Sequence, residues 1–101
     1  MENINLKYYL PMRLLYELLI KLPCDCEFEF EECYDGYKIT CNKNGKYEWD
    51  AVCHCGSYGG NSGELETMGA IVDSELVGDD VEGFLEPVEV FAKFVKKYYE
   101  P

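Results

Sequence analysis

The fold is decided by residues 24–55, which read CDCEFEFEECYDGYKITCNKNGKYEWDAVCHC. Phe28 and Phe30 alternate with glutamates, and this period of two is typical of a strand with one apolar and one acidic face. Tyr34-Asp35-Gly36 and Asn44-Gly45 are turn signals that divide the alternating stretch into three parts. The alternating apolar positions of the last part are Tyr47, Trp49, Ala51, Cys53 and Cys55. We therefore expect a three-stranded antiparallel meander.

Helices are expected on both sides of this meander. Residues 11–22 carry leucines at helical spacing with Pro11 in the first turn, whereas residues 4–10 are expected to form a separate turn or a short strand. Residues 64–72 are predicted to form a short helix, opened by a capping box of Asn61 and Glu64.

An acidic connection, residues 73–86, then leads to a last helix that begins at Pro87. The expected fold is thus α+β, with an N-terminal helix, the meander, and two C-terminal helices packed on one face of the sheet.

Length and composition favour one folded domain spanning residues 1–101. The chain has 20 acidic and 9 basic residues, a formal net charge of -11, and 48% hydrophobic residues. No apolar run approaches the roughly 20 residues of a membrane span. Met1-Glu2-Asn3 lacks the basic region of a secretory signal, so a cytoplasmic location is predicted.

Six cysteines suggest metal or thiol chemistry at first sight. Cys24-x-Cys26 and Cys53-x-Cys55 together offer four thiolates, the number that a structural zinc site uses. In a meander, however, these two pairs lie at opposite ends of the sheet. With Cys41 they fall on the expected core face, so these five are predicted to be buried, unreactive side chains, and no metal or cofactor is expected.

Cys33 and His54 are expected on the outer face, as a possible nucleophile and base. The second strand would separate them by about 9–10 Å, which is too far for a hydrogen bond. Nearby carboxylates would also disfavour the thiolate. No catalytic residue is therefore predicted, although a zinc- or thiol-dependent protein remains the alternative.

Two further segments have the composition of a binding loop. Residues 56–63 contain four glycines before a predicted helix, but they lack the lysine and the spacing of a phosphate-binding loop. Asp79, Asp80 and Glu82 lack the spacing of a calcium-binding loop. A glycine-rich turn and a solvated acidic loop are the expected structures.

Charge placement is the most unusual feature of the sequence. Residues 47–92 contain 11 acidic residues and no lysine or arginine. Glu27, Glu29 and Glu31 line one face of the first predicted strand. Such a surface repels nucleic acid and anionic membranes, but it can attract a basic protein. The alternative is that the charge only maintains solubility.

The second half of the chain contains a Tyr-Gly-x3-Gly-x-Leu-Glu-x-Met-Gly stretch at residues 58–69 and a Val-x-Gly-aromatic-Leu stretch at residues 81–85. In these two stretches it resembles small uncharacterised proteins encoded by phages and integrative mobile elements of Firmicutes. This chain departs from the pattern at Glu64, where the family has an apolar residue, and at Pro87. The resemblance implies a bacterial host cell and an action on host defence nucleases.

The sequence therefore predicts a non-enzymatic acidic protein that inhibits a host nucleic-acid-processing protein, such as a CRISPR or restriction nuclease, by mimicking nucleic acid. Its predicted contact residues are Glu27, Glu29, Glu31, Asp79, Asp80 and Glu82. An acidic structural subunit or homodimer without an inhibitory role is a further alternative.

Overall fold

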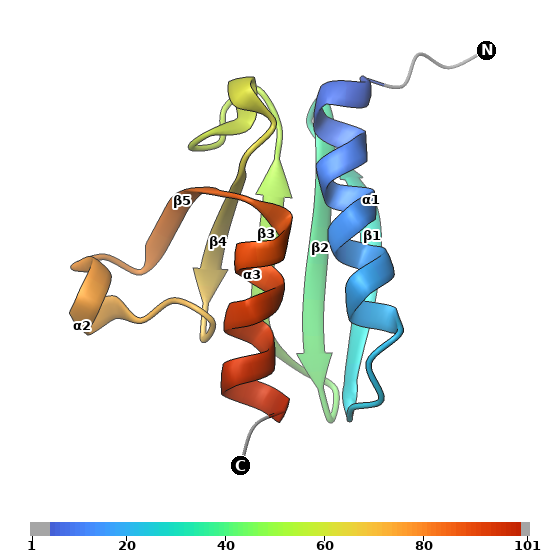
Figure 1. Ribbon diagram of the computed structural model, residues 1–101, viewed down its shortest axis with the longest axis vertical. Coiled ribbons are helices and arrows are strands. Elements are labelled where there is room, and N and C mark those ends of the chain that lie inside the picture. The colour runs from blue at the N-terminus through green and yellow to red at the C-terminus, as the bar shows by residue number, and fades with distance from the viewer. Residues whose placement is uncertain (1–4, 100–101) are drawn as a thin grey trace.

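A computed structural model describes residues 5–99 and shows an α+β fold (Figure 1). Five antiparallel strands form one sheet, and its order β1-β2-β3-β4-β5 is also the order of the chain. The elements, in chain order, are α1 (Leu6–Ile20), β1 (Cys26–Cys33), β2 (Gly36–Lys43), β3 (Lys46–Cys53), η1 (Gly60–Ser62), β4 (Leu65–Gly69), α2 (Ser74–Val77), β5 (Val81–Leu85), α3 (Pro87–Phe94) and the π-helical turn η2 (Val95–Tyr99). The expected three-stranded sheet is therefore wrong by two strands.

The N-terminal helix begins earlier than its proline suggested. Helix α1 starts at Leu6 because the side chain of Asn5 accepts a hydrogen bond from the Lys7 amide, at 3.2 Å. Pro11 consequently lies inside the helix and not in its first turn. The predicted turn or short strand before Pro11 is wrong from Leu6 onward, while Ile4 lies outside the described residues.

The first three strands follow the predicted meander. Cys26 pairs with Lys43 at one end of the β1–β2 hairpin, and Cys33 pairs with Gly36 at the other. Asn44 and Gly45 both have positive φ, at 54° and 76°, as the predicted two-residue hairpin turn requires.

A β-bulge in β3 changes which side chains face the core. The pairing steps from Cys41 opposite Trp49 to Asn42 opposite Tyr47, so Glu48 is an extra residue in β3. Trp49 is fully buried, whereas Tyr47 is half exposed. The expected alternation of Tyr47 with Trp49 on one face therefore fails at this bulge.

The fourth strand replaces the helix that was expected over residues 64–72. Leu65 and Thr67 are fully buried, and β4 pairs with β3 along its length. Gly63 ends η1 in the left-handed conformation, and the Glu64 amide bonds to Gly59 O at 2.9 Å. No capping box of Asn61 and Glu64 forms, because the chain enters a strand at that point.

The acidic connection of residues 73–86 contains two elements that were not predicted. Asp73 caps the single-turn helix α2 through a hydrogen bond from the Leu76 amide, and β5 follows. Helix α2 buries none of its residues and lies beside the sheet edge (Figure 1). Of the two C-terminal helices that were predicted, the one over residues 64–72 is therefore wrong, and the one that begins at Pro87 is present as α3.

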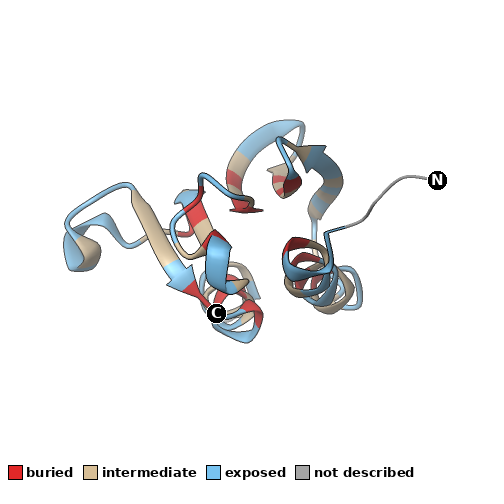
Figure 2. Cartoon of the chain, turned by 90° about the horizontal axis from the view of Figure 1, so that it is seen from above, coloured by how far each residue is buried: buried red, intermediate tan, exposed pale blue. Residues whose placement is uncertain are grey.

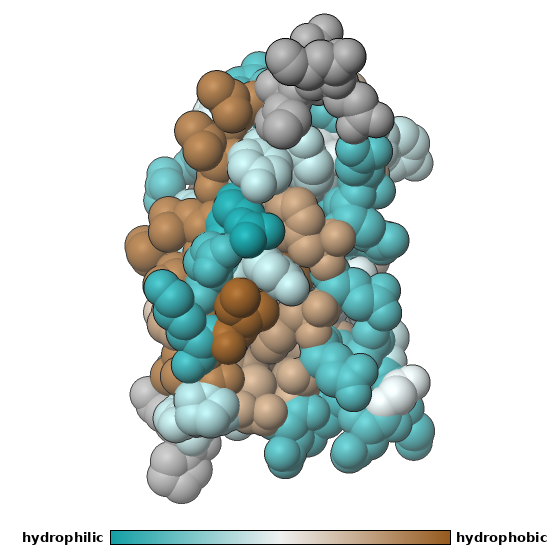
Figure 3. All heavy atoms as spheres, turned by 90° about the vertical axis from the view of Figure 1, so that its right-hand side faces the viewer, coloured by the Kyte–Doolittle hydropathy of each residue, from teal (hydrophilic) through white to brown (hydrophobic). Residues whose placement is uncertain are grey.

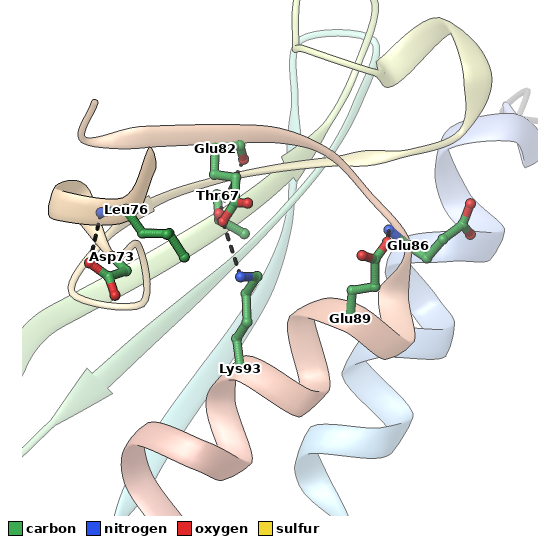
Figure 4. Close-up of polar contacts among 7 residues, drawn as sticks. All are labelled: Thr67, Asp73, Leu76, Glu82, Glu86, Glu89 and Lys93. Carbon is green, nitrogen blue, oxygen red and sulfur yellow. Dashed lines mark hydrogen bonds and ion pairs between the residues drawn. The ribbon is translucent and has the colours of Figure 1, made fainter. Parts of the chain in front are cut away.

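Helix α3 begins at Pro87, as predicted. Glu86 and Glu89 form a reciprocal capping box around its first turn (Figure 4). Both α1 and α3 cover the same face of the sheet, as the view from above shows (Figure 2). Phe94 is fully buried against the rings of Phe28 and Trp49, at centroid distances of 5.5 and 5.9 Å.

No helix within residues 5–99 combines the length and apolarity that crossing a bilayer requires.

Candidate protein-binding face

The sheet face opposite α1 and α3 is covered by no helix of the described chain (Figure 2). We call it the outer face. Its side chains alternate along each strand with those that face the helices, and one of them, Val52, is itself buried. They are Glu27, Glu29, Glu31, Lys38, Thr40, Asn42, Tyr47, Asp50, Val52, Glu66 and Met68.

Strand register arranges these side chains in rows across the sheet. One row runs Glu31, Lys38, Val52, Glu66, and the next runs Glu29, Thr40, Asp50, Met68. The outer face therefore carries five carboxylates and one lysine. Lys38 Nζ lies 3.9 Å from Glu31 Oε1, and both side chains are substantially exposed, so this ion pair neutralises the face only weakly.

The three glutamates of β1 form the densest part of the outer face. Glu27, Glu29 and Glu31 are all exposed, with carboxylates spaced by about 6.8 Å along the strand. One strand of a nucleic-acid duplex carries a charge every 3.4 Å or so along the axis. The β1 row thus has about half the charge density of such a strand, and the remaining carboxylates of the outer face supplement it.

Tyr47 reaches the outer face because of the bulge at Glu48. Its hydroxyl donates to Asp50 Oδ2 at 2.6 Å and also lies 3.3 Å from Met68 O. Burial, followed by the carboxylate of Asp50, raises the pKa of Tyr47. The phenol therefore stays protonated and keeps the Asp50 carboxylate fixed in the centre of the outer face.

The two predicted acidic clusters lie at opposite edges of the sheet. Glu27, Glu29 and Glu31 belong to β1, whereas Asp79 and Asp80 are exposed just before β5. Four strand spacings, about 19 Å, separate these edges along the sheet. The clusters therefore do not form one continuous patch.

Glu82 differs from the other predicted contact residues. It faces α3, where its Oε1 atom is buried and lies 3.3 Å from Lys93 Nζ (Figure 4). Its main-chain oxygen accepts from the hydroxyl of the buried Thr67 at 3.2 Å. Glu82 thus holds β5 and α3 together, and its carboxylate is already neutralised.

A pair of exposed aromatic residues adjoins the acidic side chain of Glu66. The rings of Tyr58 and Phe84 stack with centroids 6.5 Å apart, and Glu66 Oε1 accepts the Tyr58 amide at 3.0 Å. A Cβ atom on Gly83 would come within 2.3 Å of Tyr58 Cβ, so the two segments meet only because this residue is glycine.

This pair joins the two stretches that carried the sequence resemblance, residues 58–69 and 81–85. The Phe84 amide also bonds to Tyr58 O at 3.1 Å. Phe84 has a φ of 58°, which is rare and costly for a bulky side chain, yet the residue is 64% exposed. The two stretches thus build a local structure at the end of the sheet.

The sequence did not identify Asp50, Glu66, Tyr58 or Phe84 as members of a surface. Glu66 joins the outer face only through the β3–β4 pairing, which was missed together with β4, whereas Asp50 reaches it through the β2–β3 register, opposite Thr40. The sequence did contain a signal for the aromatic pair, because Tyr58 and Phe84 each stand next to a glycine, within residues 58–69 and 81–85.

The six cysteines differ in how far they are buried. Cys41 and Cys53 are buried as predicted, and Cys24 and Cys26 are half-buried, but Cys55 is exposed, because β3 ends at Cys53. Burial raises the pKa of Cys26, Cys41 and Cys53, the last to about 11. These thiols are therefore protonated and weakly nucleophilic near neutral pH.

Within residues 5–99, no group of three or more histidine, cysteine or acidic side chains is arranged to hold a metal ion. Cys26 lies between the thiols of Cys24 and Cys41, at the opposite end of the sheet from Cys53.

Cys33 is the last residue of β1, whereas His54 follows the last residue of β3. Cys33 pairs with Gly36, whose other neighbour is the Cys53–His54 backbone. His54 Nδ1 accepts from the Gly56 amide at 3.1 Å, and its ring lies 5.0 Å from that of Tyr34. His54 therefore stabilises the turn after β3.

The described chain has a shallow pocket near the C-terminal end of α3. Its volume is about 220 Å³, and it is lined by Pro23, Cys24, Asp25, Cys26, Lys43, Tyr98 and Tyr99. Small-molecule sites usually enclose about 300–1,000 Å³. The outer face is therefore the stronger candidate for a functional site.

Comparisons with protein-family models, with curated proteins and with solved structures found no match to this chain.

Proposed function

We propose that this chain is a non-enzymatic interaction protein that binds a basic protein through the outer face of its sheet. The single observation that carries the proposal is the excess of carboxylates on a sheet face that no described helix covers. A large uncovered sheet face is available to a partner, and its charge selects a partner of opposite sign.

The proposed partner is a protein that itself binds nucleic acid, such as a nuclease of a bacterial host, which the chain would inhibit. Its basic surface would meet carboxylates where it otherwise meets phosphates. This choice rests on the charge of the outer face and on the sequence resemblance to proteins of mobile elements. Binding of the chain and of nucleic acid to the partner should therefore be mutually exclusive.

The outer face takes precedence over the acidic loop as the proposed contact. Asp79 and Asp80 lie at the far edge, so they contact the same partner only if it spans the sheet. Glu82 contributes to stability through Lys93, so it is removed from the proposed contact set.

A charge-reversal experiment tests this proposal. Tagged protein captures partners from bacterial lysate at about 50 and 500 mM salt, because ionic contacts weaken as screening increases. The captured protein is then purified and titrated with the triple variant E27K/E29K/E31K. A matched control, E75K/D79K/D80K, changes the net charge equally but lies around α2, at the other edge.

Loss of binding in the first variant alone, with displacement of the partner by DNA or RNA, is the expected result. Equal loss in both variants would mean that total charge matters and the outer face does not. Loss in the control alone would move the contact to the acidic loop. Circular dichroism spectra of both variants verify that the fold is retained.

A further inference from the structure

Strand β1 has a free edge. It is the first strand in the sheet order, and it pairs with β2 on one side only. The other edge is less regular, because β5 has five residues, a register shift opposite β4, and Phe84 at positive φ with its amide bonded to Tyr58 O. Among residues 5–99, the eight-residue strand β1 is the edge that offers a long, regular ladder.

The register identifies which main-chain groups of β1 face outward. The two-residue turn at Asn44-Gly45 makes Lys43 and Lys46 a hydrogen-bonded pair, so odd-numbered residues of β2 bond to β3 and even-numbered ones bond to β1. The β1 residues opposite those even positions, Glu27, Glu29 and Glu31, therefore direct their main-chain groups towards β2.

The free main-chain donors and acceptors of β1 consequently belong to the intervening residues. These are Cys26, Phe28, Phe30 and Glu32. An added strand would bond to these four residues and would not disturb the β1–β2 ladder.

The side chains beside this edge specify the sequence of an added strand. On the outer face, Glu27, Glu29 and Glu31 offer negative charge. On the helix-covered face, Phe28 and Phe30 are half-buried and leave apolar surface beside α1. Figure 3 views this side of the molecule and shows an apolar strip flanked by hydrophilic residues.

The existing neighbour of β1 already has the matching pattern. Opposite the glutamates, β2 places Lys38, Thr40 and Asn42; opposite Phe30 and Phe28 it places Ile39 and Cys41. Polar or basic side chains on the outer face and apolar ones on the inner face are thus compatible with β1 as a pairing partner.

A second copy of the chain is a poor occupant of this edge. Antiparallel pairing of two β1 strands about Glu29 would place Glu27 opposite Glu31 and Glu29 opposite Glu29. Six carboxylates would then line one face of the joint sheet, and directly opposed like charges destabilise a strand pair.

We propose that β1 accepts an extended segment of the partner as a sixth strand, and that this segment alternates basic and apolar residues. This inference rests on the proposed function, since it names how the basic partner is bound. The main chain supplies the docking contacts, the glutamates select lysine or arginine, and the apolar side chains extend the layer of Phe28 and Phe30.

Amide hydrogen exchange with a defined peptide tests the proposal. The probe is an acetylated, amidated octapeptide that alternates lysine and valine, used with the full-length protein at about 50 mM salt. We expect peptide binding to slow exchange at the amides of Phe28, Phe30 and Glu32. The amides of Glu29 and Glu31 should not change, because they already bond to β2.

Matched peptides separate main-chain pairing from simple charge attraction. A peptide N-methylated at alternate valines keeps its charge but loses main-chain hydrogen-bond donors along one of its edges. A peptide N-methylated at alternate lysines loses donors along the other edge. We expect one of these two peptides to bind at least tenfold more weakly than the parent. A peptide with four lysines followed by four valines should also bind at least tenfold more weakly.

The outcomes distinguish this inference from the function on which it rests. If E27K/E29K/E31K abolishes partner binding but all peptides bind equally and no alternating protection appears, strand addition is wrong and the proposed function stands. If the lysine-valine peptide does not bind, strand addition is also wrong. The glutamates of β1 then serve only to prevent this sheet edge from pairing with the edge of another molecule. If the partner also ignores the charge reversals, both proposals fail.

Discussion

The hydroxyl of Tyr98 donates a 2.8 Å hydrogen bond to Glu48 Oε1, although the two residues lie fifty positions apart in the chain. Glu48 is the extra residue of the bulge in β3, and Tyr98 belongs to the π-helical turn that follows α3. One contact therefore joins the irregular residue of the sheet to the irregular end of the last helix.

Removing this hydrogen bond should destabilise the protein. We expect Tyr98→Phe to lower the free energy of unfolding by about 1–2 kcal/mol, because the carboxylate loses a partly buried donor. Urea unfolding measures the change. Tyr99→Phe is the matched control and should change stability by less than about 0.5 kcal/mol. Equal losses in the two variants would contradict a specific role for the Tyr98–Glu48 bond.

The ion pair between Glu82 and Lys93 should matter for stability and not for partner binding. We expect Lys93→Met to cost about 1 kcal/mol, because it leaves a partly buried carboxylate without its cation. The double variant E82Q/K93M should recover most of this loss. Asp79→Asn, at an exposed site, provides the control for removal of a charge. Full stability of Lys93→Met would show that Glu82 is solvated.

Buried thiols should make stability fall in alkaline solution. Burial raises the pKa of Cys53 to about 11 and also raises that of Cys41, whereas an unfolded thiol ionises near pH 8.5. Because the unfolded state releases these protons first, the stabilising contribution is complete below about pH 8.5 and is lost as pH rises towards the folded pKa.

Urea unfolding between pH 8 and 10 with a reductant present should show this loss. The slope of the free energy of unfolding against pH should approach about 1.4 kcal/mol per pH unit for each buried thiol. The slope in Cys53→Ala should therefore be smaller than in the parent protein by about 1.4 kcal/mol per pH unit. A stability that stays constant over this range would contradict the burial of the two thiols. Tyr47 and Tyr98, whose pKa values burial also raises, add to this loss mainly above about pH 10.

Phe84 should be replaceable by glycine without loss of stability. Its φ of 58° costs a bulky residue about 1–2 kcal/mol, and glycine removes this cost but adds about 0.5–1 kcal/mol of chain entropy. We expect Phe84→Gly to raise the free energy of unfolding by up to about 1 kcal/mol. Phe84→Ala keeps the strained backbone and should not gain stability. A large loss in Phe84→Gly would instead assign the ring a stabilising role.

The first hairpins could be predicted from the sequence, and the later strands could not. Alternating residues and Asn44-Gly45 define the β1–β3 region by local signals alone. In β4, by contrast, Leu65 and Met68 also fit helical spacing, and pairing with β3 decides between the two structures. Strand β5 is five residues long, contains Gly83 and lies within an acidic segment, so it has little pattern to recognise.

The candidate site shows the same division. The exposure of Glu27, Glu29 and Glu31 follows from strict alternation and was predicted. The burial of Glu82 does not, because its direction depends on a register shift between β4 and β5. Because Glu82 is close to Asp79 and Asp80 in the chain, the sequence suggested one acidic cluster. In the structure, Glu82 faces α3, whereas Asp79 and Asp80 are exposed.

The strand order has a consequence for how the protein folds. Because every strand pairs with its neighbour in sequence, the sheet can form hairpin by hairpin without closing a long loop. The helices are different, since α1 and α3 come from opposite ends of the chain and pack on each other. A chain emerging during synthesis can thus assemble its sheet early, but Trp49 and Phe28 stay open to water until Phe94 arrives. The interval before the last helix docks is when this protein is most exposed to aggregation.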